Sequence, residues 1–458
     1  MKNIYILFSL LVFLVCTSCE DQLNLIPAQS LPTSESLADL DGMETAVNGA
    51  YDALQSVDYY GREFVVMADI EANLAYLSIA NSNRFVSAYT YTWTVQNGDI
   101  AGVWNAGYRA ILRVNNVING IDELEGDAAR RNQIKGEALA IRALCYFDLV
   151  RFFAKPYATG TPSSDLGVPI TLEATLEELP RNTVAEVYNQ VISDLTTAKS
   201  LMTADSRTRM NALAAEALLA RVYLYQEDFT NAEASASEVI NSGEFALIDN
   251  FSNLYLSDSS SEDIFTLRFL TVETRGSDNM GQIYNPEGYG DIRVTQDLID
   301  LYEPNDQRNL IYQLSANNEY YTSKYAGQDG TIGLVSPRIL RLGEMYLIRA
   351  EARFRTNDDA GALEDLNTLR AARDASALSS IPNFRTILEE RQRELVFEGH
   401  TTFDYWRNGI TMVRSQCNTG LEVNLTSCSV NASDFRTVHP IPDDEVLVNQ
   451  NMVQNDGY

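Results

Sequence analysis

The sequence predicts a mainly α-helical fold, in which tetratricopeptide-like pairs of helices stack into a superhelix with a loop-rich, partly β side. Three observations support this prediction. Apolar residues recur every three or four positions over 128–154, 211–241 and 338–372, as on the buried stripe of a helix. Within the last two segments, two small residues lie 12 positions apart on either side of a polar turn. Between these segments the chain is rich in Gly, Asn, Ser and Tyr.

The chain begins with the pattern of an export signal. Lys2 precedes an apolar run over residues 4–15, which is too short to span a bilayer and matches the apolar part of a signal peptide. Cys19 follows two small residues, an arrangement that resembles the processing site of bacterial lipoproteins. Cys16 fits this site less well because the larger Val15 precedes it.

The same segment predicts where the protein is located. Cleavage would remove residues 1–18 as a lipoprotein signal peptide and leave Cys19 as the lipid-bearing N-terminus. The acidic pair Glu20-Asp21 resembles the surface-export signal of Bacteroidota lipoproteins. We therefore expect a lipid anchor in the outer membrane, with the protein facing the cell exterior. An ordinary secreted protein is the alternative.

Composition excludes several classes of partner. The chain has 63 Asp and Glu against 34 Lys and Arg, a net charge of -29 at pH 7, so we expect no nucleic-acid binding. Two His and five Cys are too few for a His-rich or Cys-rich metal site. Oxygen ligands could bind calcium, but no motif indicates it. We expect no cofactor and assign no metal ligands.

The first long helix is predicted over 128–154, and Pro156 ends it. Cys145 lies on its apolar stripe, where we expect it to be inert. The other stripe residues are Ile134, Ala138, Ile141, Leu149 and Phe152.

Two helical hairpins are predicted next. Ala220 and Ala232 mark the close approach of two helices in the first hairpin, and Ala350 and Ala362 mark it in the second. One hairpin cannot bury its apolar stripe alone, so the hairpins should stack into a right-handed array with the looser 128–154 region.

Residues 243–337 have the composition of a loop-rich insertion, with strand-like runs at 263–269 and 320–325. Loops on a rigid scaffold often hold functional residues, so this insertion and residues 56–105 are the expected ligand-binding side. We expect 19–242 and 243–458 to be two parts of one compact fold, with an irregular tail from Asn408 onward.

Side-chain pairs near the C-terminus have structural interpretations. Cys417 and Cys428 could form a disulfide in an exported protein, and closing that short loop would stabilise the fold by about 3 kcal/mol. Glu389 and Arg393 lie four positions apart on a predicted helix and can pair.

No motif in the sequence indicates catalysis. The nucleophile-elbow, zinc-protease, phosphate-loop and dinucleotide patterns are all missing from it. A glycosidase needs two acids at a defined separation, but among 63 acids some pair will meet any spacing. His400 and His439 lie near no nucleophile motif, and we interpret both as structural or surface residues. We therefore expect a protein that is not an enzyme.

Aromatic rings flanked by polar side chains offer a candidate site. Sugars present C–H faces to rings and hydroxyls to Asn, Asp or Arg at the rim. Burial is the competing interpretation, because the alternation of Tyr89, Tyr91 and Trp93 also fits a strand with one buried face. The candidate ligand contacts are Tyr59, Tyr60, Asn83, Arg84, Trp93, Tyr284, Asn285 and Tyr289.

Five ordered segments extend the interpretation to the whole chain. They are Trp104 to Ile111 with Asn115-Asn116; Gly136 to Ala143 with Tyr146-Phe147; Arg341 to Glu351; Glu390-Arg391 with Glu394-Leu395 and Phe403-Asp404; and His439 to Pro442 with Gln454 to Tyr458. Through these segments, residues 19–458 resemble the SusD/RagB family of outer-membrane nutrient-binding lipoproteins. One departure is Thr401-Thr402, where the family usually has Arg and an aromatic residue.

The resemblance implies a tetratricopeptide-like superhelix without catalysis. It implies that the protein covers a SusC-like TonB-dependent transporter, captures a glycan or oligosaccharide, and delivers it to the pore. It also implies that the motif segments are mostly structural.

Three alternatives remain at this point. A RagB-like protein of the same architecture would capture peptides, and strand edges open to backbone pairing would favour it. A surface glycosidase would need two facing acids, one with a raised pKa. A pure scaffold would bind only the transporter.

Overall fold

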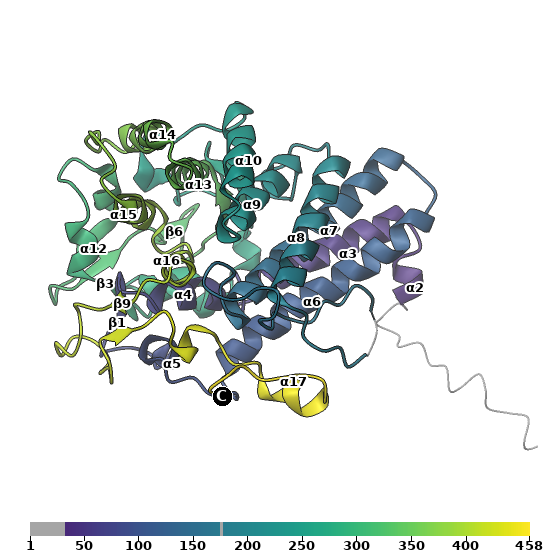
Figure 1. The fold of residues 1–458 in the computed structure, drawn as a ribbon, viewed down its shortest axis with the longest axis horizontal. Helices are drawn as coiled ribbons and strands as arrows, with labels where there is room; N and C mark the ends of the chain where they lie inside the picture. Colours follow the sequence, from purple (N-terminus) through teal and green to yellow (C-terminus); the bar gives the residue numbers. More distant parts are fainter. Residues whose placement is uncertain (1–32, 175–176) are drawn as a thin grey trace, which may run out of the picture.

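The computed structural model describes residues 33–174 and 177–458. The predicted signal peptide and the predicted lipidation site, Cys19, lie outside the described residues. Helices are the main regular structure and pack in succession from one end of the molecule to the other (Figure 1). They are α2 (Thr33–Ser36), α3 (Leu40–Leu54), α4 (Glu63–Ile70), α5 (Val86–Thr90), α6 (Gly98–Gly120), α7 (Ala128–Phe153), α8 (Val184–Leu201), α9 (Ala212–Tyr225), α10 (Phe229–Asn241), α11 (Met280–Tyr284), α12 (Gln296–Asp300), α13 (Leu342–Arg355), α14 (Asp359–Ala371), α15 (Phe384–Leu395), α16 (Thr401–Arg407) and α17 (Asp443–Val448).

Helix α7 confirms the helix predicted over 128–154. The Asp127 side chain caps its N-terminus by accepting a hydrogen bond from the backbone N–H of Ala129. The helix packs between α6 and α8, so its second half is buried all round. Cys145 lies there as a free buried thiol.

The two predicted hairpins are α9 with α10 and α13 with α14. All four marker alanines are fully buried, which confirms that small residues lie at the close approach of the helices. The turns are alike as well. Glu227 and Asn357 both adopt positive φ, and the next residue, Asp228 or Asp358, caps the following helix. Between the hairpins α10 packs on α13, so the helices form one stacked array.

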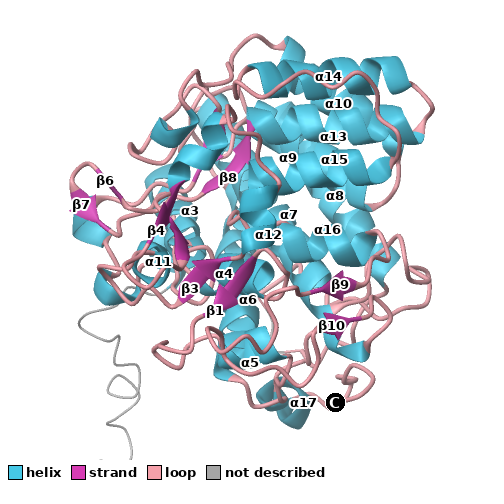
Figure 2. Ribbon diagram, turned by 90° about the vertical axis from the view of Figure 1, so that its left-hand side faces the viewer, coloured by secondary structure: helices cyan, strands magenta, loops and turns pink. Residues whose placement is uncertain are grey.

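The short strands gather on one side of the helical array (Figure 2). The largest sheet has the antiparallel order β1-β3-β5-β4, with Ala75 opposite Val294 at the start of β1. The predicted strands at 263–269 and 320–325 are confirmed as β2 and β5, although both are shorter than predicted. The strands are β1 (Ala75–Leu77), β2 (Asp263–Thr266), β3 (Ile292–Val294), β4 (Tyr312–Leu314), β5 (Tyr320–Thr322), β6 (Gly327–Gln328), β7 (Thr331–Ile332), β8 (Arg338–Arg341), β9 (Met412–Val413) and β10 (Ser429–Val430).

The segment containing Tyr89, Tyr91 and Trp93 is buried, but it is not a strand. Its first part is α5, and Phe85 and Tyr91 at either end of that helix have left-handed backbone conformations. All three rings nevertheless face the core.

One main apolar core extends from Leu40 to Met452, and a smaller cluster fills the space between α13, α14 and α15. None of the helices within 33–174 and 177–458 is both long enough and apolar enough to cross a membrane.

Candidate functional site

Four of the eight predicted contact residues lie in the core. The hydroxyls of Tyr59 and Tyr60 donate to the same carboxylate oxygen of Asp148, at 2.6 and 2.7 Å. Arg151 binds the other oxygen of that carboxylate. Each tyrosine is thus buried with its polar atom satisfied.

Trp93 and Tyr284 are also covered by protein. The indole N–H of Trp93 donates to the hydroxyl of Tyr458 at 2.7 Å, and its ring centroid lies 4.5 Å from that of His439. Tyr284 packs against two other aromatic rings and has no exposed surface. The prediction of ligand contact is therefore wrong for these four residues, because neighbouring side chains occupy the ring faces a sugar would need.

The other four residues lie on the loop-rich side. The guanidinium carbon of Arg84 lies 4.2 Å from the ring centroid of Tyr289, although the residues are 205 positions apart. Tyr289 is 37% exposed, Asn83 is exposed beside Arg84, and Asn285 is half-buried. We call these four residues the loop-face site. A stacked cation holds the ring in place and presents N–H donors at its edge.

Asp278 connects this site to the core. It lies at the end of the short 3₁₀ helix Gly276–Asp278 and accepts from Arg84 at 3.3 Å and from Arg62 at 2.8 Å. Sequence reasoning missed Arg62 and Asp278. They lie 216 positions apart, and no local pattern links them.

The loop that carries Asn83 and Arg84 is held by Asp291. That carboxylate is buried, and it accepts hydrogen bonds from the backbone N–H and the hydroxyl of Ser82. The side chain of Asn81 closes the turn by accepting from the N–H of Asn83. Asn83 has φ of 64°, a conformation that Asn tolerates better than most residues.

Asn285 positions the second loop of the site. Its side-chain oxygen accepts from the N–H of Glu287 at 3.0 Å, and the N–H of Tyr289 donates to the carbonyl of Gln282. This turn places the Tyr289 ring above Arg84.

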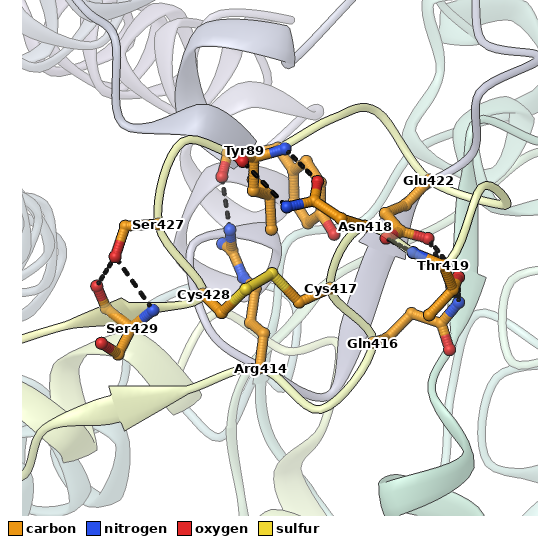
Figure 3. The surroundings of a disulfide bond; sticks show 11 residues. Tyr89, Arg414, Gln416, Cys417, Asn418, Thr419, Glu422, Ser427, Cys428 and Ser429 are labelled. Carbon is orange, nitrogen blue, oxygen red and sulfur yellow. Dashed lines mark hydrogen bonds between the residues drawn. A yellow bond between two sulfur atoms is a disulfide. The ribbon is translucent and has the colours of Figure 1, made fainter.

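A disulfide closes the segment that pairs with β1. Cys417 and Cys428 are bonded, which confirms the predicted pair (Figure 3). Within the closed loop, Val423 donates to the carbonyl of Leu77, and Ile79 donates back to Leu421. The loop therefore covers the outer edge of β1, directly before the chain enters the loop-face site.

Two acids lie beneath the site. Burial raises the pKa of Glu63 to about 7, although its carboxylate pairs with Arg62. Burial also raises the pKa of Asp99, with Arg62 acting in the opposite direction. Glu63 is 3% exposed, so it faces Arg62 rather than solvent.

Both histidines are structural, as predicted. His439 is buried between the carbonyl of Phe152 and the carboxylate of Glu71, at 3.0 and 2.9 Å from its two ring nitrogens. His400 is buried, and that burial holds its pKa well below the usual value. The predicted Glu389–Arg393 pair is present at 3.8 Å.

Surface hollows lie elsewhere on the molecule. One of about 670 Å³ lies between α12, α15 and the segment around Val413, and another of about 530 Å³ lies beside Phe435. In the described part of the chain, no three His, Cys, Asp or Glu side chains are arranged to hold a metal ion.

Comparison with known proteins identifies the architecture. Residues 29–224 match a family described as starch-binding and associating with the outer membrane, and residues 311–458 match the SusD family. A crystal structure of a SusD superfamily protein from Bacteroides thetaiotaomicron has a TM-score of 0.85 and 30% identity, over 91% of this chain and 99% of that one.

Two characterised sequences are also similar. SusD-like protein P2 of Formosa agariphila is 25% identical over 89% of this chain and 91% of its own length. The starch-binding protein SusD of Bacteroides thetaiotaomicron is 31% identical over 120 residues, which are 26% of this chain and 21% of that protein. With its helical array and these matches across both halves, the chain belongs to the SusD/RagB family.

Proposed function

We propose that this protein is a cell-surface lipoprotein that captures oligosaccharides and passes them to a SusC-like TonB-dependent transporter in the outer membrane. The observation that carries the proposal is the exposed ring of Tyr289, stacked on Arg84, in a chain whose relatives include a starch-binding protein. The lipid on Cys19 would hold the protein at the membrane.

The loop-face site has the parts that sugar binding needs. Tyr289 offers an apolar face to sugar C–H groups, while Arg84 and Asn83 offer polar groups for hydroxyls at its edge. Asp278 accepts from Arg84 and Asp291 accepts from Ser82, so these contacts fix the loops before a ligand arrives and little ordering accompanies binding. A small open site also favours modest affinity, which suits release to a transporter.

We further propose that the protein does not catalyse hydrolysis. The acids with pKa values raised to about 7 and 8, Glu63 and Asp69, are both buried. A glycosidase would need such an acid facing a groove opposite a second carboxylate.

The test uses residues 20–458, which lack the lipid-bearing cysteine. The protein is run through native gels containing individual polysaccharides, and the same mixtures are assayed for released fragments. We expect retardation by one glycan class without products. Tyr289→Ala should weaken binding about fivefold to tenfold, because it removes the ring platform.

Phe435→Ala is the matched control. Phe435 is 45% exposed, and it and Tyr289 are the two exposed aromatic residues within 33–174 and 177–458. It lies beside a different hollow, so its loss should leave binding unchanged. Released fragments would contradict the non-catalytic proposal, and equal effects of the two variants would remove the loop-face site from it.

Peptide capture is the second candidate, and one observation favours it. Strand β4 is an outer strand of the four-stranded sheet, and Leu314 on it is 53% exposed. An extended peptide could pair with such an edge. Binding of peptides, together with no binding of any glycan, would establish this function instead.

A further inference from the structure

A basic pocket lies near the loop-face site in this strongly acidic protein. It has a volume of about 240 Å³ and lies between α3, α6 and the residue before the 3₁₀ helix Gly276–Asp278. Among the residues that the structure describes, three arginines line it, Arg109, Arg113 and Arg275, together with one carboxylate, Asp52. The lining therefore carries two more positive than negative charges, on a chain of net charge -29.

The fold brings these guanidinium groups together from distant segments. Arg109 and Arg113 are four positions apart on α6, so they lie on the same helix face. Arg275 comes from the insertion, and Asp52 comes from α3, which packs along α6 (Figure 1). No local sequence pattern predicts that these three arginines lie around one pocket.

The pocket has more donors than acceptors. Asp52 lies 3.5 Å from both Arg113 and Arg275, too far for short charge-assisted hydrogen bonds, and its side chain is 64% exposed. No described residue accepts a hydrogen bond from the buried Nε of Arg275. Arg109 is exposed, and no ion pair or hydrogen bond to it occurs within the described ranges. Clustered guanidinium groups with unused donors are suited to carboxylate or sulfate oxygens.

The pocket is within reach of a glycan at Tyr289. Arg275 and Asp278 are three residues apart, which limits their separation to about 11 Å. Asp278 pairs with Arg84, and Arg84 stacks on one face of the Tyr289 ring. An oligosaccharide with one unit on that ring can therefore place a charged substituent of a later unit among the arginines.

We infer that the protein captures an acidic glycan, and that Arg109, Arg113 and Arg275 bind its carboxylate or sulfate groups. This inference rests on the proposed function and names the substrate class. A neutral glycan would leave the pocket unused.

The test compares three oligosaccharides of matched length by calorimetry with residues 20–458: a neutral galactan, an oligogalacturonate and a sulfated galactan. We expect at least one acidic ligand to bind about tenfold more tightly than the neutral one, with a preference that falls as salt is raised. The two acidic ligands separate carboxylate from sulfate recognition.

Arg109→Gln is the informative variant, because within residues 33–174 and 177–458 the Arg109 side chain has no hydrogen-bond or ion-pair partner whose loss would disturb folding. It should remove most of the acidic preference and leave neutral binding within about twofold. Arg385→Gln is the control: this arginine is 82% exposed and lines the hollow beside α15 instead. It should change neither affinity.

The outcomes separate the two proposals. Equal affinity for neutral and acidic ligands, or a full acidic preference in Arg109→Gln, would overturn the acidic-glycan inference and leave glycan capture standing. Failure to bind any of these ligands or any polysaccharide in the gels would overturn both.

Discussion

Asp69 combines deep burial with an unsatisfied oxygen. One carboxyl oxygen accepts from the N–H of Gly399 at 3.0 Å, and no residue in the described part of the chain donates a hydrogen bond to the other. Burial outweighs the favourable contacts and raises the pKa of Asp69 from 3.8 to about 8. The folded protein therefore holds a neutral carboxyl here at neutral pH, whereas the unfolded chain ionises it.

This residue predicts a pH dependence of stability. The folded pKa exceeds the unfolded value, so folding loses stability progressively as pH rises from about 4 to about 8, and the loss levels off above that. Asp69→Asn mimics the neutral form and should flatten the part of this dependence between pH 6 and pH 9. Thermal melts of both proteins at these two pH values check it.

Glu63, with a pKa of about 7, contributes a smaller loss that the variant retains. At pH 9 the variant should melt above the wild type. A parallel decline of both proteins between pH 6 and pH 9 would assign the dependence to other groups.

Sequence reasoning identified the chemistry of individual side chains but not their exposure. A tyrosine fits the core when a distant group accepts its hydroxyl, as Asp148 does for Tyr59 from 89 positions away. Tyr289 has no such partner in the core and instead contacts Arg84 at the surface. Exposure therefore depends on tertiary contacts that periodicity does not record.

Elements with a strong local signal were predicted well. The helices at 128–153, 212–241 and 342–371 follow their apolar spacing, and Ala220 and Ala350 lie where two helices meet. The strand that would also fit the alternation of Tyr89, Tyr91 and Trp93 does not form. The first part of that segment is α5, and Phe85 and Tyr91 at its ends have positive φ, which such residues rarely adopt. Packing of both rings in the core offsets this backbone cost.

The disulfide loop gives a prediction at the scale of an element. Cys417→Ser with Cys428→Ser should lower the free energy of unfolding by about 2–3 kcal/mol, because the open loop gains entropy in the unfolded chain. Urea unfolding of the double variant and the wild type measures this difference.

Cys145→Ser is a poor control because that thiol is fully buried, so the wild type under reducing conditions serves instead. Reduction should reproduce the effect of the double variant. Unchanged unfolding in both cases would mean that the hydrogen bonds of Val423 and Ile79 with the β1 segment suffice to hold the loop.

The whole molecule is connected through a buried ionic network around Glu394 on α15. Its carboxylate accepts from Arg308, Arg341 and Arg373 at 3.1, 2.6 and 2.8 Å. Arg308 belongs to the insertion, Arg341 precedes α13 and Arg373 follows α14. One side chain thus joins the loop-rich side to the second hairpin.

This network gives a structural role to residues of the segments that carry the family resemblance. Arg341 and Glu394 lie in two of the five segments, and both are buried in ion pairs away from the loop-face site. The resemblance could therefore predict the architecture, while the site depended on loops that the segments do not include.

Glu394→Gln should be the most damaging of the substitutions considered. The three arginines hold the pKa of Glu394 well below its usual range, so the carboxylate is charged wherever the protein is folded near neutral pH. Neutralising it leaves three buried guanidinium groups short of one counter-charge, which should destabilise the protein by about 3–5 kcal/mol. Glu389→Gln on the same helix is the control, because Glu389 is 28% exposed and its ion-pair partners among the described residues are Arg385 and Arg393. Chemical unfolding should place Glu389→Gln within about 1 kcal/mol of the wild type. Similar losses of unfolding free energy for the two variants would show that the neighbouring carboxylates, Glu262 and Glu390, neutralise the arginines without Glu394. The network would then be a set of independent ion pairs.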